Sequence, residues 1–211
     1  MGKHLCALAL LAASATATAQ TENYKHVGSL ESAGQLDKDH YSFSYLAPSN
    51  TYSDIEWEQY RDKKEKRNTV MVIGLSGYDT YALSVLYKGQ ADAGQTALDA
   101  ATQRYPSADF ALTDLNPACA TTPTDKPFAL DGRMYTFLAV CIDQRSRAVY
   151  EVGISWRSLI LAMKSIDRVA EESAACAEQK RNDPQARCPD YLGTYSAAYR
   201  KVLSTFAMKG K

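Results

Sequence analysis

The chain has 211 residues, with 24 Lys and Arg against 24 Asp and Glu, so its formal net charge is zero. This balance excludes the global basic field that binding to nucleic acid or to an anionic membrane requires. The length predicts one domain, or one domain with an appendage, that is large enough to bury a core.

The first nineteen residues have the pattern of a secretory signal peptide. Lys3 gives a basic head, the run 5–13 is apolar, and 17–19 supply the small residues that a signal peptidase reads, so we expect cleavage before Gln20. A membrane anchor is the alternative, but the apolar run is about half of the ~20 residues that a span needs. Cys6 lies at the beginning of this run, whereas a lipidated cysteine would follow it. Since no later segment is apolar enough to span a bilayer, we expect a soluble periplasmic or secreted protein.

Four cysteines remain after this cleavage: Cys119, Cys141, Cys176 and Cys188. An even number in an exported protein predicts disulfides, and three pairings are possible. We favour the pairing Cys119–Cys141 and Cys176–Cys188, because each pair joins neighbouring elements. Free buried thiols are the alternative to disulfides. A zinc site is not expected, since there is no C-x-x-C pair and the histidines that remain, His26 and His40, lie far away in the sequence.

The N-terminal half predicts a leader followed by strands. Residues 20–40 are polar without periodicity, which indicates a flexible leader. Alternation over 41–45 predicts a half-buried strand, and the charge-dense stretch 54–67 predicts a short surface helix. The run 70–75 is apolar on both faces and predicts a central strand, which the alternating stretch 81–87 follows as the second strand of a hairpin.

Apolar residues at helical spacing predict a helix over 91–105, which Pro106 ends. A short strand is expected at 108–112, and further strands at 128–130 and 133–140.

The best local signal is the Asp-Gly pair at 131–132, which favours the positive φ angles of a two-residue type I′ turn. This turn places Leu130 opposite Arg133 and brings Cys141 within reach of Cys119.

The C-terminal third changes from strand to helix. Alternation over 150–156 predicts a strand, helical spacing predicts a helix over 158–180, and residues 182–184 break it before a last helix that opens at Cys188. A disulfide from Cys188 to Cys176 joins these two helices.

The elements together predict an α+β fold, with an antiparallel sheet of about six to seven strands, one helix mid-chain and two C-terminal helices packed on it. This element order is similar to that of Mog1/PsbP-like domains. We therefore divide the chain into a signal peptide (1–19), a leader (20–40) and a single domain (41–211) that ends in a disulfide-stapled helix pair.

No motif predicts a nucleophile or a cofactor site. The stretch 74–77 around Ser76 resembles a nucleophile elbow, but Tyr78 stands where the elbow needs glycine and the turn leads into a strand, so a hairpin turn is the better interpretation. His26 and His40 would have to serve any Ser-His-Asp or Cys-His device, and we interpret both as solvent-exposed bystanders.

Carboxylates can perform acid–base catalysis without histidine. The candidate groups are Asp54, Glu56 and Glu58 together, and Asp109 with Asp114. Exposed surface charge is the ordinary interpretation of both groups. The same interpretation applies to the basic cluster within 61–67, although an acidic partner or an anionic cell-wall polymer is an alternative.

Aromatic residues give the remaining indication of function. The chain has 14 Tyr, and Tyr52, Trp57 and Tyr60 gather in an irregular polar segment that begins after Tyr45. Because Tyr and Trp are enriched at interface hot spots, we predict that the segment 45–60 is a partner-contacting loop with these three residues as anchors. Core packing under a loop is the alternative.

These observations favour a non-catalytic extracytoplasmic binding protein with a protein partner in the cell envelope. An inhibitor or immunity protein that acts against a secreted or cell-wall-active enzyme is one concrete form. The alternatives are an envelope hydrolase whose carboxylates converge only in three dimensions, and a carrier of a small apolar ligand between the sheet and the helices. No metal, cofactor or nucleic-acid partner is expected.

Overall fold

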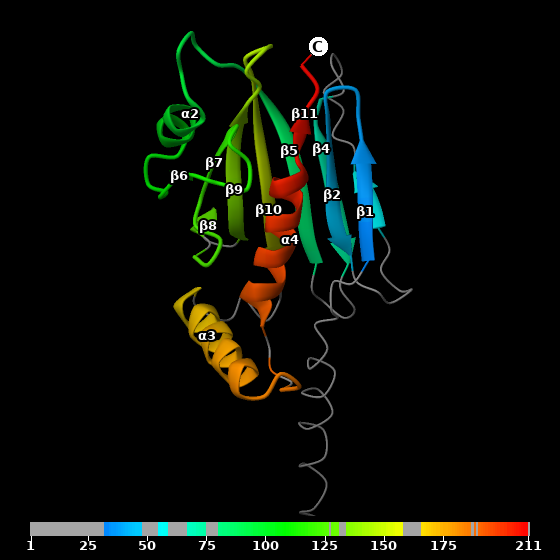
Figure 1. The fold of residues 1–211 in the computed structure, drawn as a ribbon, viewed down its shortest axis with the longest axis vertical. Coiled ribbons are helices and arrows are strands. Elements are labelled where there is room, and N and C mark those ends of the chain that lie inside the picture. Colours follow the sequence, from blue (N-terminus) through cyan, green and yellow to red (C-terminus); the bar gives the residue numbers. More distant parts are fainter. Residues whose placement is uncertain are drawn as a thin grey trace, which may run out of the picture.

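The computed structural model describes residues 32–47, 55–58, 67–74, 80–126, 128–130, 134–157, 166–186, 188 and 190–210. The predicted signal peptide lies outside these ranges. The strands are β1 (Ser32–Asp37), β2 (Tyr41–Ala47), β3 (Ile55–Glu58), β4 (Thr69–Gly74), β5 (Thr80–Gln90), β6 (Ala111–Leu112), β7 (Cys119–Thr121), β8 (Phe128–Leu130), β9 (Met134–Ile142), β10 (Ala148–Arg157) and β11 (Ala207–Met208). The helices are α2 (Ala97–Arg104), α3 (Ile166–Asn182) and α4 (Tyr191–Thr205) (Figure 1).

The strands form two antiparallel sheets. The large sheet has the order β3-β4-β5-β10-β9-β7-β6, with β8 also paired to β9, and the small sheet has the order β1-β2-β11. With one helix mid-chain and two at the C-terminal end, this arrangement confirms the predicted α+β class. The number of strands was underestimated, because β1, β3, β7 and β11 were not predicted. None of the helices in the described part has the length and apolar character to cross a membrane.

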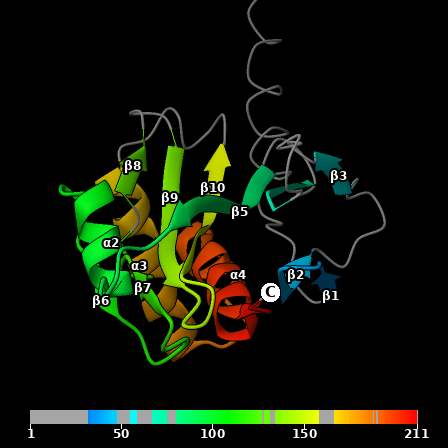
Figure 2. The ribbon, with the colours of Figure 1, turned by 90° about the horizontal axis from the view of Figure 1, so that it is seen from above.

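The large sheet is covered on both faces. Helix α4 and the small sheet pack on one face, and α2 packs on the other beside β7 and β9 (Figure 2). Strand β9 shows the consequence for sequence: Phe137 and Ala139 belong to the α4 side, whereas Val140 and Ile142 belong to the α2 side. A strand that is buried on both faces is apolar at nearly every position, as β9 is.

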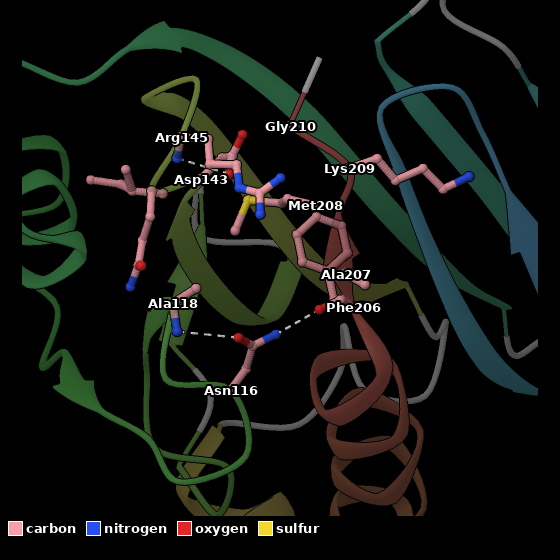
Figure 3. Close-up of a pocket in the computed structure, with 11 residues that line it drawn as sticks. Asn116, Ala118, Asp143, Arg145, Phe206, Ala207, Met208, Lys209 and Gly210 are labelled. Carbon is pink, nitrogen blue, oxygen red and sulfur yellow. Dashed lines mark hydrogen bonds between the residues drawn. The ribbon is translucent and has the colours of Figure 1, made fainter.

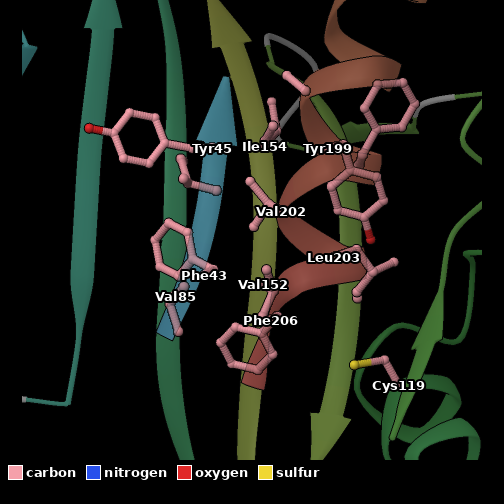
Figure 4. Packing of buried hydrophobic residues seen from close by; sticks show 14 of the residues in the cluster. Phe43, Tyr45, Val85, Cys119, Val152, Ile154, Tyr199, Val202, Leu203 and Phe206 are labelled. Atoms are coloured by element: carbon pink, nitrogen blue, oxygen red, sulfur yellow. The ribbon is translucent and has the colours of Figure 1, made fainter. Parts of the chain in front are cut away.

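The main core lies between the large sheet, α4 and β2 (Figure 4). Aromatic rings fill much of it, and Tyr41, Phe43 and Tyr199 are among its largest fully buried side chains. Their polar ends are satisfied, since the Tyr41 hydroxyl lies 2.7 Å from the Thr69 hydroxyl and the Tyr199 hydroxyl 2.6 Å from that of Thr121. The high tyrosine content of the chain is therefore partly explained by core packing.

Helix α2 is shorter than the predicted 91–105 because its N-terminus is capped. The Thr96 side chain accepts a hydrogen bond from the Asp99 N–H, and the Asp99 carboxylate accepts one from the Thr96 N–H. This reciprocal capping box starts the helix at Ala97.

Both predicted disulfides are present. Cys119 and Cys141 are register partners on β7 and β9, with their Cα atoms 4.0 Å apart, and Cys176 in α3 bonds to Cys188 ahead of α4. The predicted hairpin register is wrong by one residue, because Leu130 pairs with Met134 rather than Arg133. Residues 131–133 of the turn lie outside the described part.

Two further predictions need correction. The leader was extended too far, since β1 already pairs with β2 from Ser32 and buries Leu36 against the core. The helix over 54–67 is wrong at 55–58, because this stretch forms β3 and pairs with β4. Its glutamates favour helix, but pairing with an apolar strand overrides local propensity.

Candidate functional site

An open pocket of about 530 Å³ lies where the C-terminal end of the chain passes the end of β9. Three stretches far apart in sequence line it: Asn116 and Ala118 ahead of β7, residues 142–145 at the β9–β10 turn, and residues 206–210 around β11 (Figure 3). Pockets that bind small molecules have volumes of roughly 300–1,000 Å³. The size therefore suits a ligand of this kind.

Asn116 fixes one wall of the pocket. Its amide nitrogen donates to the carbonyl oxygens of Leu203 (3.1 Å) and Phe206 (2.8 Å), and its amide oxygen accepts from the Ala118 N–H (3.2 Å). The last carbonyls of a helix lack partners within the helix. Asn116 supplies partners at the end of α4 and so holds β11 at a fixed distance from β7.

Asp143 fixes the opposite wall. Its carboxylate accepts hydrogen bonds from the backbone N–H groups of Arg145 and Ser146, both at 3.2 Å, and from the Ser146 hydroxyl. Burial alone would raise the pKa of Asp143, but these hydrogen bonds and the nearby positive charge of Arg145 outweigh it, and the pKa lies below its ordinary value. Asp143 is therefore ionised at neutral pH and is engaged in shaping the turn. Gly210 passes close to it, and a Cβ there would lie 3.1 Å from the carboxylate.

The two cations of the pocket have different roles. Lys209 forms an ion pair with Asp37 of β1 and points away from the pocket, toward the small sheet. Arg145 extends from the β9–β10 turn toward β11 (Figure 3). Its side chain is exposed, and its guanidinium has no hydrogen bond or ion pair with any residue in the described ranges.

The free edge of β11 borders the same pocket. The Lys209 N–H donates to the His40 carbonyl (2.9 Å), and Ala207 pairs with Ser42, so these two residues use their backbone groups toward β2. In an antiparallel ladder, successive residues direct these groups to opposite edges. The N–H and C=O of Met208 therefore face away from β2, on the pocket side, and neither has a hydrogen-bond partner among the described residues.

A second polar cluster lies under the end of α2. Glu151 of β10 is buried, with Lys88 Nζ at 3.0 Å and Arg104 Nη1 at 3.8 Å. Burial, and next the charge of Glu151, raise the pKa of Tyr105 to about 12, so its hydroxyl stays protonated and hydrogen-bonds to that carboxylate. Arg104 also donates to the Lys88 carbonyl (3.1 Å). This network joins α2 to β5 and β10, which makes it an anchor of the fold.

The residues predicted as partner anchors are placed only in part. Tyr52 and Tyr60 lie outside the described part of the chain, and the Trp57 backbone lies in β3 opposite Met71. Tyr45, where the predicted loop begins, is instead buried in β2 and belongs to the core.

The other candidates from the sequence are dispersed. Ser76, His26 and Asp54 lie outside the described residues. Glu56 and Glu58 lie in β3, and Asp109 and Asp114 are both exposed on either side of β6. His40 contributes its backbone carbonyl to the small sheet.

Sequence reasoning missed the pocket residues Asn116, Asp143, Arg145 and Met208. The sequence offers one signal there, the polar run 143–147, which is typical of a turn but does not show what the turn faces. Within the described ranges, no three His, Cys, Asp or Glu side chains are grouped so that they could hold a metal ion. The chain matches no protein-family model, no curated protein and no solved structure at a significant level.

Proposed function

We propose that the protein is an extracytoplasmic binding protein that holds an extended segment of a protein partner in the pocket beside β11. The observation that carries this proposal is that the backbone N–H and C=O of Met208 border an open pocket and have no partner among the residues that the structure describes. Addition of a peptide strand to an exposed sheet edge is a recurrent mode of recognition, in which main-chain hydrogen bonds supply affinity. An added strand would pair with Met208 and occupy the space between β11 and the β9–β10 turn.

The location supports a partner in the cell envelope. Two disulfides indicate an oxidising, exported environment. The predicted signal peptide adds to this support, and periplasmic protein should have an intact mass that begins at or near Gln20. Full-length chain recovered from the membrane fraction would contradict the proposed location.

An inhibitor or immunity protein is the concrete form that we propose for this binding function, with a secreted or cell-wall-active enzyme as the target. The pocket walls support it, because Asn116 and Asp143 hold them in place before any partner arrives. A preformed site loses little conformational entropy on binding, which favours affinity.

The segment 45–60 remains a predicted second contact, now limited to the part after β2. In the described part of the large sheet, β3 is the terminal strand, so Trp57 lies on a sheet edge. Trp57→Ala should leave the melting temperature nearly unchanged while weakening capture of the partner about 30-fold, which corresponds to about 2 kcal/mol. A variant that melts early but binds normally once folded would show that Trp57 belongs to the core.

Met208→Pro tests the strand-addition proposal directly. Proline removes only the N–H on the free edge, because the ladder bonds to β2 come from Ala207 and Lys209. Immobilised mature protein should capture its partner from envelope extract, the Met208→Pro variant should fail, and Leu112→Ser at the exposed β6 edge should capture normally. A folded Met208→Pro variant that captures the same partner equally well would refute the proposal.

A further inference from the structure

We infer that the segment bound beside β11 is acidic, with a carboxylate that pairs with Arg145; this inference rests on the proposed function. Three charged side chains line the pocket: Asp143, Arg145 and Lys209. Asp143 is satisfied by three hydrogen bonds from its own turn, and Lys209 is paired with Asp37. Asp143 keeps its negative charge near Arg145, but its carboxylate is already occupied by those hydrogen bonds. Among these three groups, the Arg145 guanidinium is the one whose N–H donors have no partner in the described part of the chain.

The position of Arg145 suits a side chain of an added strand. The residue lies on the turn across the pocket from β11, and its guanidinium points into the space between them (Figure 3). A strand paired with Met208 would direct alternate side chains to opposite faces. A carboxylate on one of these positions can accept two parallel N–H bonds from the planar guanidinium, which adds geometric specificity as well as attraction.

The turn that carries Arg145 is held rigidly. The Arg145 N–H donates to Asp143, and Arg147 has the left-handed φ of 60° that closes the turn. The Arg147 guanidinium donates to the carbonyl oxygens of Asp92 and Gln95, both at 2.7 Å. The backbone of Arg145 is thus fixed before binding, so only its side chain has to be ordered by the ligand.

Defined peptides test the inference without a known partner. The probe is a fluorescein-labelled short peptide of alternating threonine and valine, flanked by serines, with a central aspartate. Its matched controls carry lysine at the centre, or the aspartate with N-methylated backbone amides that cannot pair with a strand. Anisotropy titrations of the disulfide-bonded mature protein should show about tenfold tighter binding of the aspartate peptide than of the lysine peptide, a difference of about 1.4 kcal/mol.

Arg145→Gln should weaken binding of the aspartate peptide about tenfold and remove the preference over lysine. Arg145→Lys should retain part of the preference, since a point charge remains. The matched control is Arg168→Gln on α3, which removes one positive charge at a site outside the pocket and should leave the preference intact. Higher salt should reduce the preference because the pair is exposed.

The outcomes separate this inference from the proposed function. Equal binding of the aspartate and lysine peptides, with loss on N-methylation, would overturn the acidic preference and leave strand addition standing. Binding that survives N-methylation would contradict strand addition itself, as would no binding of any peptide. Competition by N-acetylaspartate as strong as that of the peptide would overturn the inference in favour of a site for a small free carboxylate.

Discussion

Replacing Lys88 by Met should destabilise the fold more than neutralising its partner Glu151. The Glu151 side chain is only 6% exposed, whereas the Lys88 side chain is 32% exposed and the Arg104 side chain 35%. Without Glu151, both cations turn toward water at little cost. Without Lys88, the carboxylate stays buried and keeps only the more distant Arg104, at 3.8 Å, and the hydroxyl of Tyr105.

The expected magnitudes follow from this asymmetry. Loss of one partner from a buried ion pair costs about 3–5 kcal/mol. Because Arg104 remains beside Glu151, we place the cost of Lys88→Met near the lower limit, at about 3 kcal/mol. Glu151→Gln keeps the shape and a hydrogen bond to Tyr105, so it should cost about 1 kcal/mol. At about 2–4 °C per kcal/mol for a domain of this length, Lys88→Met should lower the melting temperature by about 6–12 °C.

Urea unfolding of the disulfide-intact protein measures these differences, with Lys126→Met as the control at an exposed lysine. The double variant of Lys88 and Glu151 should be less destabilised than the sum of the single variants, by about 1.5 kcal/mol, because the neutral amide no longer needs a cation. Strict additivity, or a larger loss for Glu151→Gln than for Lys88→Met, would refute the account of a desolvated carboxylate held by two cations.

Three further predictions concern the core and the disulfides. Tyr199→Phe removes the buried 2.6 Å hydrogen bond to Thr121 and should cost about 1 kcal/mol in urea unfolding; an unchanged midpoint would contradict this. Replacing Cys176 and Cys188 together by Ser should lower the free energy of unfolding by about 3 kcal/mol and expose the backbone amides of α3 to hydrogen exchange. Continued protection of these amides would contradict a stabilising role of the disulfide. Burial raises the pKa of Tyr41 to about 12, so the stabilising effect of its protonated hydroxyl is complete below pH 10 and is lost as the pH rises toward 12, at up to about 1.4 kcal/mol per pH unit. Tyr41→Phe should flatten this dependence of the unfolding free energy on pH. An equal slope in the variant would contradict the assignment to Tyr41.

Short-range patterns in the sequence predicted the fold class and several elements. Alternation identified the strands β5 and β10, because a residue's face in a strand depends only on its position in the period of two. The Cys119–Cys141 disulfide was predicted although the proposed hairpin register was wrong by one residue. The chain there needed only to return in an antiparallel direction, so small register errors did not change which cysteines meet.

The missed strands depend on partners that are distant in sequence. The sequence of β3 has the pattern of a charged helix, and it forms a strand because it pairs with β4. The sequence of β1 has the pattern of a polar leader, and it is ordered because it pairs with β2 and buries Leu36 in the core. Strand β11 has only two residues, too few for any period to show, and it exists because α4 ends beside β2. In each case tertiary pairing, rather than local propensity, decides the conformation.

The pocket was not predictable from the sequence because it also depends on contacts between segments that are distant in sequence. Asn116, Asp143 and Met208 share no motif, and each is explained locally as a turn, a cap or a chain end. They line one pocket because two sheets and the end of α4 converge there, and among the described residues this leaves the Met208 backbone groups and the Arg145 guanidinium without partners. Recognition through main-chain groups requires few particular side chains apart from Arg145. The residues to test first are therefore those that control the β11 edge and its charge, Met208 and Arg145, with Trp57 of the predicted aromatic contact tested beside them.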